Sequence, residues 1–187
     1  MKLIVGLGNP GARYETTRHN AGYLMLDQLC DKFEVELSSW KGVGCLGKGD
    51  VFGQETLFFK TNSYMNLSGM GVCSVVRFFR IDPVDLVVIH DDVDVPSMKV
   101  KMRLGGSSGG HNGVKDIIDK IGSADFYRIK LGVGKPQVED YVMNDWVLGR
   151  LPDEYLKELG SSMFDGVLTR IKEVWTKGIK SEVQVSE

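Results

Sequence analysis

The sequence predicts an α/β fold in which a twisted, mixed β-sheet is flanked by helices. Strand-like apolar runs alternate along the chain with segments of helical periodicity, an order typical of a sheet whose strands are joined by helices. Residues 43–60 hold two short strand-like runs separated by the turn "DVFG", which predicts a hairpin. The 187 residues suffice for one hydrophobic core and contain no linker-like stretch, so we expect residues 1–187 to form a single domain.

Besides this hairpin, the first half of the chain predicts one strand and two helices. Residues 3–7 form a short, branched apolar run stopped by glycine, which suits a buried strand. Apolar residues recur at helical spacing over residues 21–33, and Asn20 is placed to act as the N-cap. A small polar segment precedes residues 67–79, whose apolar face predicts the second helix.

The second half contains the clearest buried strand, residues 85–90 ("DLVVIH"), which runs into the acidic residues Asp91, Asp92 and Asp94. Helical patterns follow at residues 114–121 and 152–177. Because loops beyond the carboxyl ends of strands form the binding crevice of such sheets, the acidic cluster is placed where a site is expected.

Composition is that of a globular protein, with 42% hydrophobic and 26% charged residues. No apolar run approaches the roughly 20 residues that span a bilayer, and the N-terminus lacks the features of a signal peptide, so we expect a cytoplasmic protein. The cysteines are three, without paired C-x-x-C spacing, which indicates neither a disulfide framework nor a zinc site.

A formal net charge of −2 means that a nucleic-acid partner would require a local basic surface. Two strand-like segments alternate basic and apolar residues, so that their basic side chains share one face. These side chains are Lys99, Lys101 and Arg103 on the first segment, and Arg128 and Lys130 on the second. The simpler interpretation is a solvated strand face, and a substrate carrying phosphates would make the same face a binding surface.

The opening stretch "LIVGLGNPGARYETTRHN" contains the G-x-G-x-x-G spacing of dinucleotide-binding folds. Two further features of those folds are missing. Pro10 and a polar segment delay the helix, and Asp27 falls inside that helix rather than after a second strand. We therefore expect the glycines to form a tight turn that presents Asn9 and lets Tyr14 and His19 fold back over the strand end.

The chain has three histidines, His19, His90 and His111. His90 ends a buried strand, where a hydrogen-bonded core histidine is expected, whereas His111 could be structural, RNA-contacting or reactive. Neighbouring residues on a strand point to opposite faces, so the "HDDVD" run does not favour a metal site. A single acid at the strand end could instead hold the tautomer of a histidine that activates water.

Three asparagines stand in separate glycine-containing loops: Asn9, Asn66 and Asn112. Each alone is typical of a turn or cap. Together they indicate a neutral site lined by amides, which donate to a carbonyl or developing oxyanion and accept from a peptide N–H. Such a site suits an ester or amide substrate. No G-x-S-x-G elbow is present to support a serine hydrolase.

At these positions the chain resembles the bacterial peptidyl-tRNA hydrolases along essentially its full length. The motifs that carry the resemblance are "IVGLGNPGARYETTRHNAG", "YMNLSG", "VVIHDDVDVP", "GGHNG" and "YRIKLGVG", in this order. The resemblance implies a monomeric enzyme without metal or cofactor that hydrolyses the ester joining a peptide to the 3′ end of tRNA. It also implies a twisted mixed sheet flanked by helices.

The resemblance assigns roles by position. His19 corresponds to the general base and Asp91 to the acid that orients it. Substrate contacts are implied for Asn9, Tyr14, Tyr64, Met65, Asn66 and Asn112, with Asn9 similar to the residue that discriminates blocked from free aminoacyl ends. We also expect His111, next to Asn112, to contact the substrate. Lys101 and Lys130 are the expected contacts to tRNA phosphates by family position, and Arg103 is added because it shares the basic strand face with Lys101.

Two departures from the family stand out, and two other functions remain in competition. Ser108 stands where some members carry histidine, and the final residues, "KGIKSEVQVSE", match family endings poorly. A non-catalytic tRNA- or RNA-binding protein is the main alternative. A nucleotide-dependent oxidoreductase is the third, and it is weakened by the late helix start after Gly11.

Overall fold

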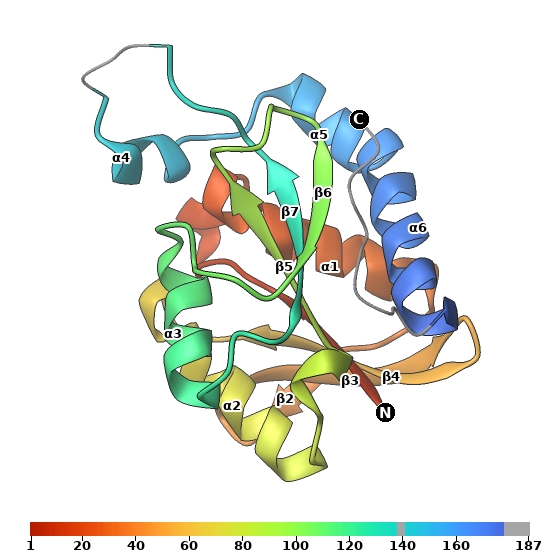
Figure 1. Cartoon of the computed structure of the whole chain (residues 1–187). Coiled ribbons are helices and arrows are strands. Elements are labelled where there is room, and N and C mark those ends of the chain that lie inside the picture. The colour runs from red at the N-terminus through yellow and green to blue at the C-terminus, as the bar shows by residue number, and fades with distance from the viewer. Residues whose placement is uncertain (138–140, 178–187) are drawn as a thin grey trace.

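A computed structural model describes residues 1–137 and 141–177, and within these residues it contains one seven-stranded mixed sheet (Figure 1). The strand order is β2-β3-β4-β1-β5-β7-β6. β4, β1, β5 and β7 run parallel, whereas β2, β3 and β6 pair antiparallel at the two edges. The strands are β1 (Lys2–Gly6), β2 (Ser38–Trp40), β3 (Gly44–Val51), β4 (Gln54–Thr61), β5 (Leu86–Asp92), β6 (Val100–Leu104) and β7 (Tyr127–Gly132). The predicted mixed α/β fold is confirmed.

Helices cover both faces of the sheet, with α1 and α6 on one side and α2 and α3 on the other (Figure 1). The α-helices are α1 (Ala21–Lys32), α2 (Ser68–Phe79), α3 (Asn112–Ile121), α4 (Met143–Val147), α5 (Asp153–Leu159) and α6 (Ser162–Lys177). Four short 3₁₀ turns are η1 (Ala12–Tyr14), η2 (Arg18–Asn20), η3 (Met65–Leu67) and η4 (Pro83–Asp85). Among the described residues, no helix is both long and apolar enough to cross a membrane.

Two hydrophobic cores result from the alternation of side chains along the strands. In β1, Ile4 packs with residues of α1 and α6, whereas Leu3 and Val5 pack with residues of α2 and α3. All three side chains are completely buried, and each contributes about 1.5–3 kcal/mol relative to an exposed position. The same alternation in β5 directs Asp91 to the α1 face and His90 to the α3 face.

The glycines of the opening motif are explained by packing. A Cβ built on Gly6 would lie 2.5 Å from the carbonyl oxygen of Gly22, and one on Gly8 would lie 2.5 Å from the ring of Tyr23. Gly11 has a φ of +104°, which disfavours any other residue. These glycines therefore let α1 approach the end of β1 closely, in agreement with the predicted turn.

Four details differ from the sequence-based expectations. The short strand β2 and the five-residue helix α4 were not predicted, because neither is long enough to show a period. The helical region at residues 152–177 is two helices that separate around Gly160. Asn20 occupies the N-cap position of α1 without a capping bond, because its side chain bonds the backbone of Asn9 instead.

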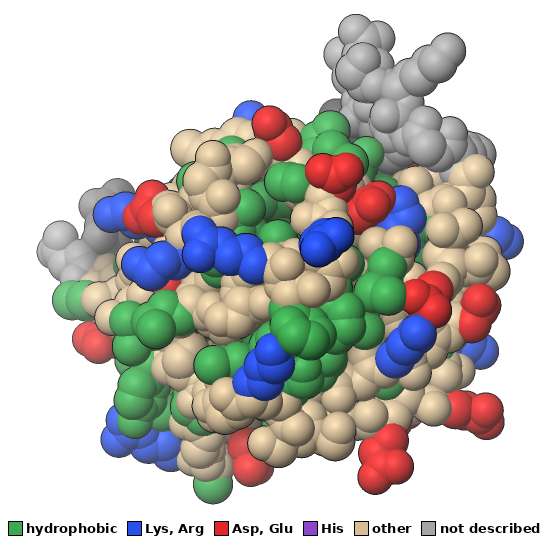
Figure 2. Space-filling view, turned by 90° about the horizontal axis from the view of Figure 1, so that it is seen from below, with side chains coloured by type: hydrophobic (Ala, Val, Ile, Leu, Met, Phe, Trp, Pro, Cys, Tyr) green, Lys and Arg blue, Asp and Glu red, His purple; other side chains and the backbone are tan. Residues whose placement is uncertain are grey.

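Figure 2 shows the face seen from below in Figure 1, on which apolar side chains gather between separate lysine and arginine side chains. No histidine is visible on this face. The histidines instead meet near the carboxyl edge of the parallel strands, where β1 and β5 end side by side.

Candidate active site

His19 and Asp91 form a buried pair where η2 folds back over the end of β5. Nδ1 of His19 lies 2.9 and 3.0 Å from the two carboxylate oxygens of Asp91. The histidine is 9% exposed and the aspartate 1%. The predicted turn therefore brings together two residues that are 72 positions apart in the chain.

His111 donates a second hydrogen bond to the same carboxylate. Its Nε2 lies 2.9 Å from Oδ1 of Asp91, while its Nδ1 accepts from the backbone N–H of Val114 at 3.3 Å and so caps α3. A nitrogen that accepts from an N–H carries no proton, so Nε2 is the protonated nitrogen of His111. Both nitrogens of His111 are therefore engaged in hydrogen bonds, which leaves it no free position to act as a base.

The carboxylate of Asp91 remains ionised. Burial alone raises the pKa of Asp91, but attraction and hydrogen bonds from His19 and His111 outweigh it and hold the pKa well below its usual range. An ionised carboxylate only accepts hydrogen bonds, so His19 donates from Nδ1. Within residues 1–137 and 141–177, Nε2 of His19 has no hydrogen-bond partner and is the nitrogen available to a substrate or water.

His90 is 1% exposed, with its ring centroid 4.7 Å from that of His111. Nδ1 of His90 donates to the backbone oxygen of Asp91 at 2.6 Å, whereas its buried Nε2 has no partner within the described residues. Burial and the neighbouring His111 lower the pKa of His90 to about 3, so this ring is neutral. The expected core histidine is thus buried, but only one of its nitrogens is hydrogen-bonded.

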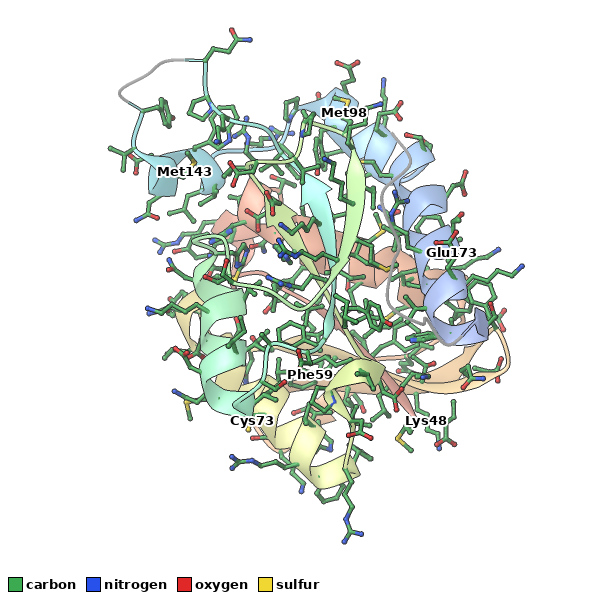
Figure 3. The ribbon with its side chains drawn as sticks, viewed as in Figure 1. Lys48, Phe59, Cys73, Met98, Met143 and Glu173 are labelled. Carbon is green, nitrogen blue, oxygen red and sulfur yellow. The ribbon has the colours of Figure 1, made fainter. Side chains whose placement is uncertain are left out.

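A cavity of about 140 Å³ opens beside the His19–Asp91 pair. The loop that leads into α3 forms part of its lining and α4 forms another part. The lining residues are His19, Asp91, Asp92, Val93, Gly109, Gly110, His111, Asn112, Met143, Asn144 and Val147. Figure 3 shows Met143 on α4, on the side of the molecule where α3 begins. Sequence reasoning missed the three α4 residues because a helix of five residues gives no periodic signal.

The three asparagines hold different positions. Oδ1 of Asn9 accepts from the backbone N–H of Met65 at 2.7 Å, and backbone groups of Asn9 bond the side chain of Asn20. Asn112 begins α3 and lines the cavity, while Asn66 is exposed on η3. Asn9 and Asn66 do not line the cavity, so the expected amide-lined site has one amide inside it and two on the adjoining loops.

The half-buried Tyr14 and the exposed Tyr64 form an aromatic pair next to these loops. Their ring centroids are 6.3 Å apart in an edge-to-face arrangement, and Tyr64 is 54% exposed. Met65 is buried, with its sulfur so close to Gly113 that a Cβ there would lie 2.5 Å away. The aromatic rings are therefore accessible to a ligand, whereas Met65 joins the η3 loop to the start of α3.

Lys101 and Arg103 are exposed on the edge strand β6, as a phosphate-binding surface requires. Lys130 lies opposite Lys101 in register, but its Nζ is 2.8 Å from a carboxylate oxygen of Asp92. Arg128 is a correction to the predicted basic face. It is 1% exposed and donates to the backbone oxygen of Ser107 beneath the glycine-rich loop, so it is a core residue.

His19, Asp91 and His111 place three possible ligand atoms within 4.8 Å of one another. The donor set does not favour a divalent ion, because both histidine nitrogens in question already donate to Asp91. A metal would have to displace both of these hydrogen bonds. That no metal is needed stays a prediction.

A buried histidine–carboxylate pair beside a cavity, at the carboxyl edge of a mixed α/β sheet, is an arrangement typical of hydrolytic enzymes. Comparisons with known proteins identify the family. The sequence profile of the peptidyl-tRNA hydrolases matches residues 3–187, and the chain belongs to the peptidyl-tRNA hydrolase family.

Relatives and solved structures agree with this assignment. A peptidyl-tRNA hydrolase of Brevibacillus brevis is 43% identical over 157 residues, which cover 82% of this chain and 83% of the relative. One from Geobacillus thermodenitrificans is 46% identical over 154 residues, covering 82% of each. The crystal structure of the Acinetobacter baumannii peptidyl-tRNA hydrolase superposes with a TM-score of 0.86 at 34% identity, covering 95% of this chain and 90% of that one.

Proposed function

We propose that this enzyme hydrolyses the ester between a peptide, or an N-blocked amino acid, and the 3′ end of tRNA, with His19 as the general base. The observation that carries the proposal is the hydrogen-bond pattern around Asp91. It leaves one imidazole nitrogen, Nε2 of His19, free beside the cavity. Membership of the family supports the substrate.

The reaction follows from that single free nitrogen. Nε2 of His19 takes a proton from water while the water oxygen bonds to the ester carbonyl carbon. The imidazolium then returns the proton to the 3′ oxygen of the ribose as the carbon–oxygen ester bond breaks. Asp91 stabilises the imidazolium through the bond to Nδ1 and holds the required tautomer. General-base catalysis of this kind contributes roughly 10²- to 10⁴-fold.

The amide of Asn112 is the proposed donor to the developing oxyanion, because it lines the same cavity as His19. Asn9 is proposed to read the peptide side. Its Oδ1 is committed to Met65, which leaves the NH₂ group to donate to a ligand. An NH₂ donor suits the carbonyl of a blocked amino acid and repels a free ammonium group, which would discriminate against unblocked aminoacyl-tRNA.

Lys101 and Arg103 are proposed to bind the tRNA backbone, with Tyr14, Tyr64 and Asn66 contacting the terminal ribose and the peptide. Lys130 joins them only when its bond to Asp92 is released or shared. Met65 contributes through its backbone N–H, which orients Asn9. We further propose a cytoplasmic, monomeric enzyme that needs no cofactor.

The deciding experiment measures release of labelled N-acetyl-amino acid from tRNA. Wild type is compared with His19→Ala, and each is also given the unblocked aminoacyl-tRNA. We expect cleavage of the blocked ester by the wild type alone, with similar tRNA affinity in both proteins. Binding of tRNA without cleavage by the wild type would favour the non-catalytic RNA-binding alternative. A near-normal rate in His19→Ala would exclude His19 as the base.

A further inference from the structure

The helix α4 forms a wall of the cavity, yet within residues 1–137 and 141–177 few contacts hold it in place. Figure 1 shows it at the margin of the molecule, away from the two helical layers. Val147 is its one buried side chain, whereas Met143 and Asn144 are exposed even though they line the cavity. Whatever fixes α4 therefore also fixes the width of the cavity next to His19.

The guanidinium of Arg18 is the main contact to α4 from the catalytic segment. It stacks on the indole of Trp146, with its carbon 3.6 Å from the ring centroid, and its Nη1 donates to the backbone oxygen of Trp146 at 3.3 Å. The other side of α4 is tied to the end of β7, because the indole N–H of Trp146 donates to the backbone oxygen of Gly134 at 2.8 Å. Trp146 is thus held from two directions.

The backbone next to Arg18 extends this contact. Its N–H donates to the oxygen of Gly149 at 3.0 Å, Thr17 bridges to Arg150, and the N–H of Leu151 donates to Thr16 at 2.8 Å. Segments more than 120 residues apart are therefore joined one residue away from His19. A change in the position of α4 is transmitted to the cavity at this point.

From these contacts we infer that Arg18 is a positioning residue for substrate binding: its stack on Trp146 sets the distance between the α4 wall and His19. This inference rests on the proposed function. The wall contacts the acyl group of the ester in the ground state and in the transition state alike. Interactions that are equal in the two states change KM and leave kcat unaltered.

The test uses the full chain and compares Arg18→Gln, Trp146→Leu and the double variant. For N-acetyl-aminoacyl-tRNA we expect each single change to raise KM about five- to tenfold, with kcat within about twofold and an unchanged pH profile of kcat. The KM of the double variant should not exceed the higher of the two single-variant KM values, because all three variants lose the same Arg18–Trp146 interaction. Lys41→Gln is the matched control, since it removes a cation from the ring of Phe78, at 3.4 Å, outside the cavity.

A second measurement does not depend on activity. In ¹⁵N-tryptophan-labelled protein, hydrogen exchange of the Trp146 indole should accelerate several-fold in Arg18→Gln and stay unchanged in Lys41→Gln. Unchanged KM and unchanged exchange in Arg18→Gln would overturn the inference. A fall in kcat with a shifted pH profile would overturn it as well, because Arg18 would then hold His19 rather than α4. An inactive wild type with accelerated exchange in Arg18→Gln would refute the proposed function and leave the Arg18–Trp146 contact confirmed.

Discussion

Replacement of Asp91 by asparagine tests the hydrogen-bond pattern on which the proposed mechanism depends. In the wild type the carboxylate accepts from Nδ1 of His19 and from Nε2 of His111. His111 cannot reverse its tautomer, because Val114 donates to its other nitrogen. An asparagine that keeps its oxygen at the position of Oδ1 places its NH₂ group at the position of Oδ2, 3.0 Å from Nδ1 of His19, where it cannot accept a hydrogen bond from that nitrogen.

The magnitude follows from the bonds that are weakened. A hydrogen bond to a charged group contributes about 1.5–3 kcal/mol, and the substitution removes the charge from both bonds while placing a donor near Nδ1 of His19. A loss of about 2–4 kcal/mol of transition-state stabilisation corresponds to a fall in kcat of roughly 30- to 1000-fold. The stability of the fold should change less, because asparagine has nearly the same shape.

The assay is single-turnover hydrolysis of N-acetyl-aminoacyl-tRNA at saturating enzyme, with tRNA affinity measured separately. Asp94→Asn is the matched control, since Asp94 is exposed and pairs with Lys135 at the surface. We expect Asp94→Asn to stay within about twofold of wild type. A kcat for Asp91→Asn within threefold of wild type would refute the reasoning, because the carboxylate would then not be supporting His19.

Three other substitutions probe the remaining parts of the site. The variant His111→Ala should destabilise the fold by about 0.5–2 kcal/mol more than His111→Asn, because asparagine can still cap α3. Both variants should lower kcat. Equal denaturation midpoints for the two variants would argue against the cap. Burial lowers the pKa of His90 to about 3 in the folded protein. Between about pH 6.5 and pH 3, His90 therefore binds a proton in the unfolded chain but not in the folded one. Stability should therefore fall as the pH drops from 6.5 to 4.5, by roughly 1 kcal/mol per unit, and urea titrations should show a flatter dependence in His90→Leu. The charge reversal Lys101→Glu should raise KM and should reduce by about one the slope of log affinity for tRNA against log salt concentration. The control Lys157→Glu on α5 should change neither quantity. Equal slopes for the two variants would show that Lys101 is not part of the binding surface.

Patterns in the sequence were sufficient to predict a sheet covered by helices. Residues 86–89, within the predicted strand 85–90, and residues 3–7 are continuous apolar runs because both faces of β5 and β1 are covered, and such runs are the strongest strand signal. The hairpin of β3 and β4 was also predictable from its turn, where Gly53 takes a positive φ. The edge strand β2 was not predictable, because two exposed serines and one half-buried tryptophan carry no hydrophobic pattern.

The site was predictable by position more than by geometry. The pairing of His19 with Asp91 follows from the resemblance and is supported by the turn after β1. The bond from His111 to the same carboxylate has no sequence signal, because it depends on where α3 starts relative to β5. Arg128 is a residue whose sequence pattern predicted the wrong environment. Its period-two alternation with Lys130 is that of a solvated face, yet the glycine-rich loop covers the inner part of that face and buries it.

The occupied nitrogens of His111 have a consequence for isotope effects. Because Asp91 already accepts hydrogen bonds from both histidines and His111 has no free nitrogen, the proposed mechanism moves a single hydrogen when water attacks the ester. The rate of the chemical step in mixtures of light and heavy water should therefore decline as a straight line with the deuterium fraction. A relay through a second histidine would bend that line downward.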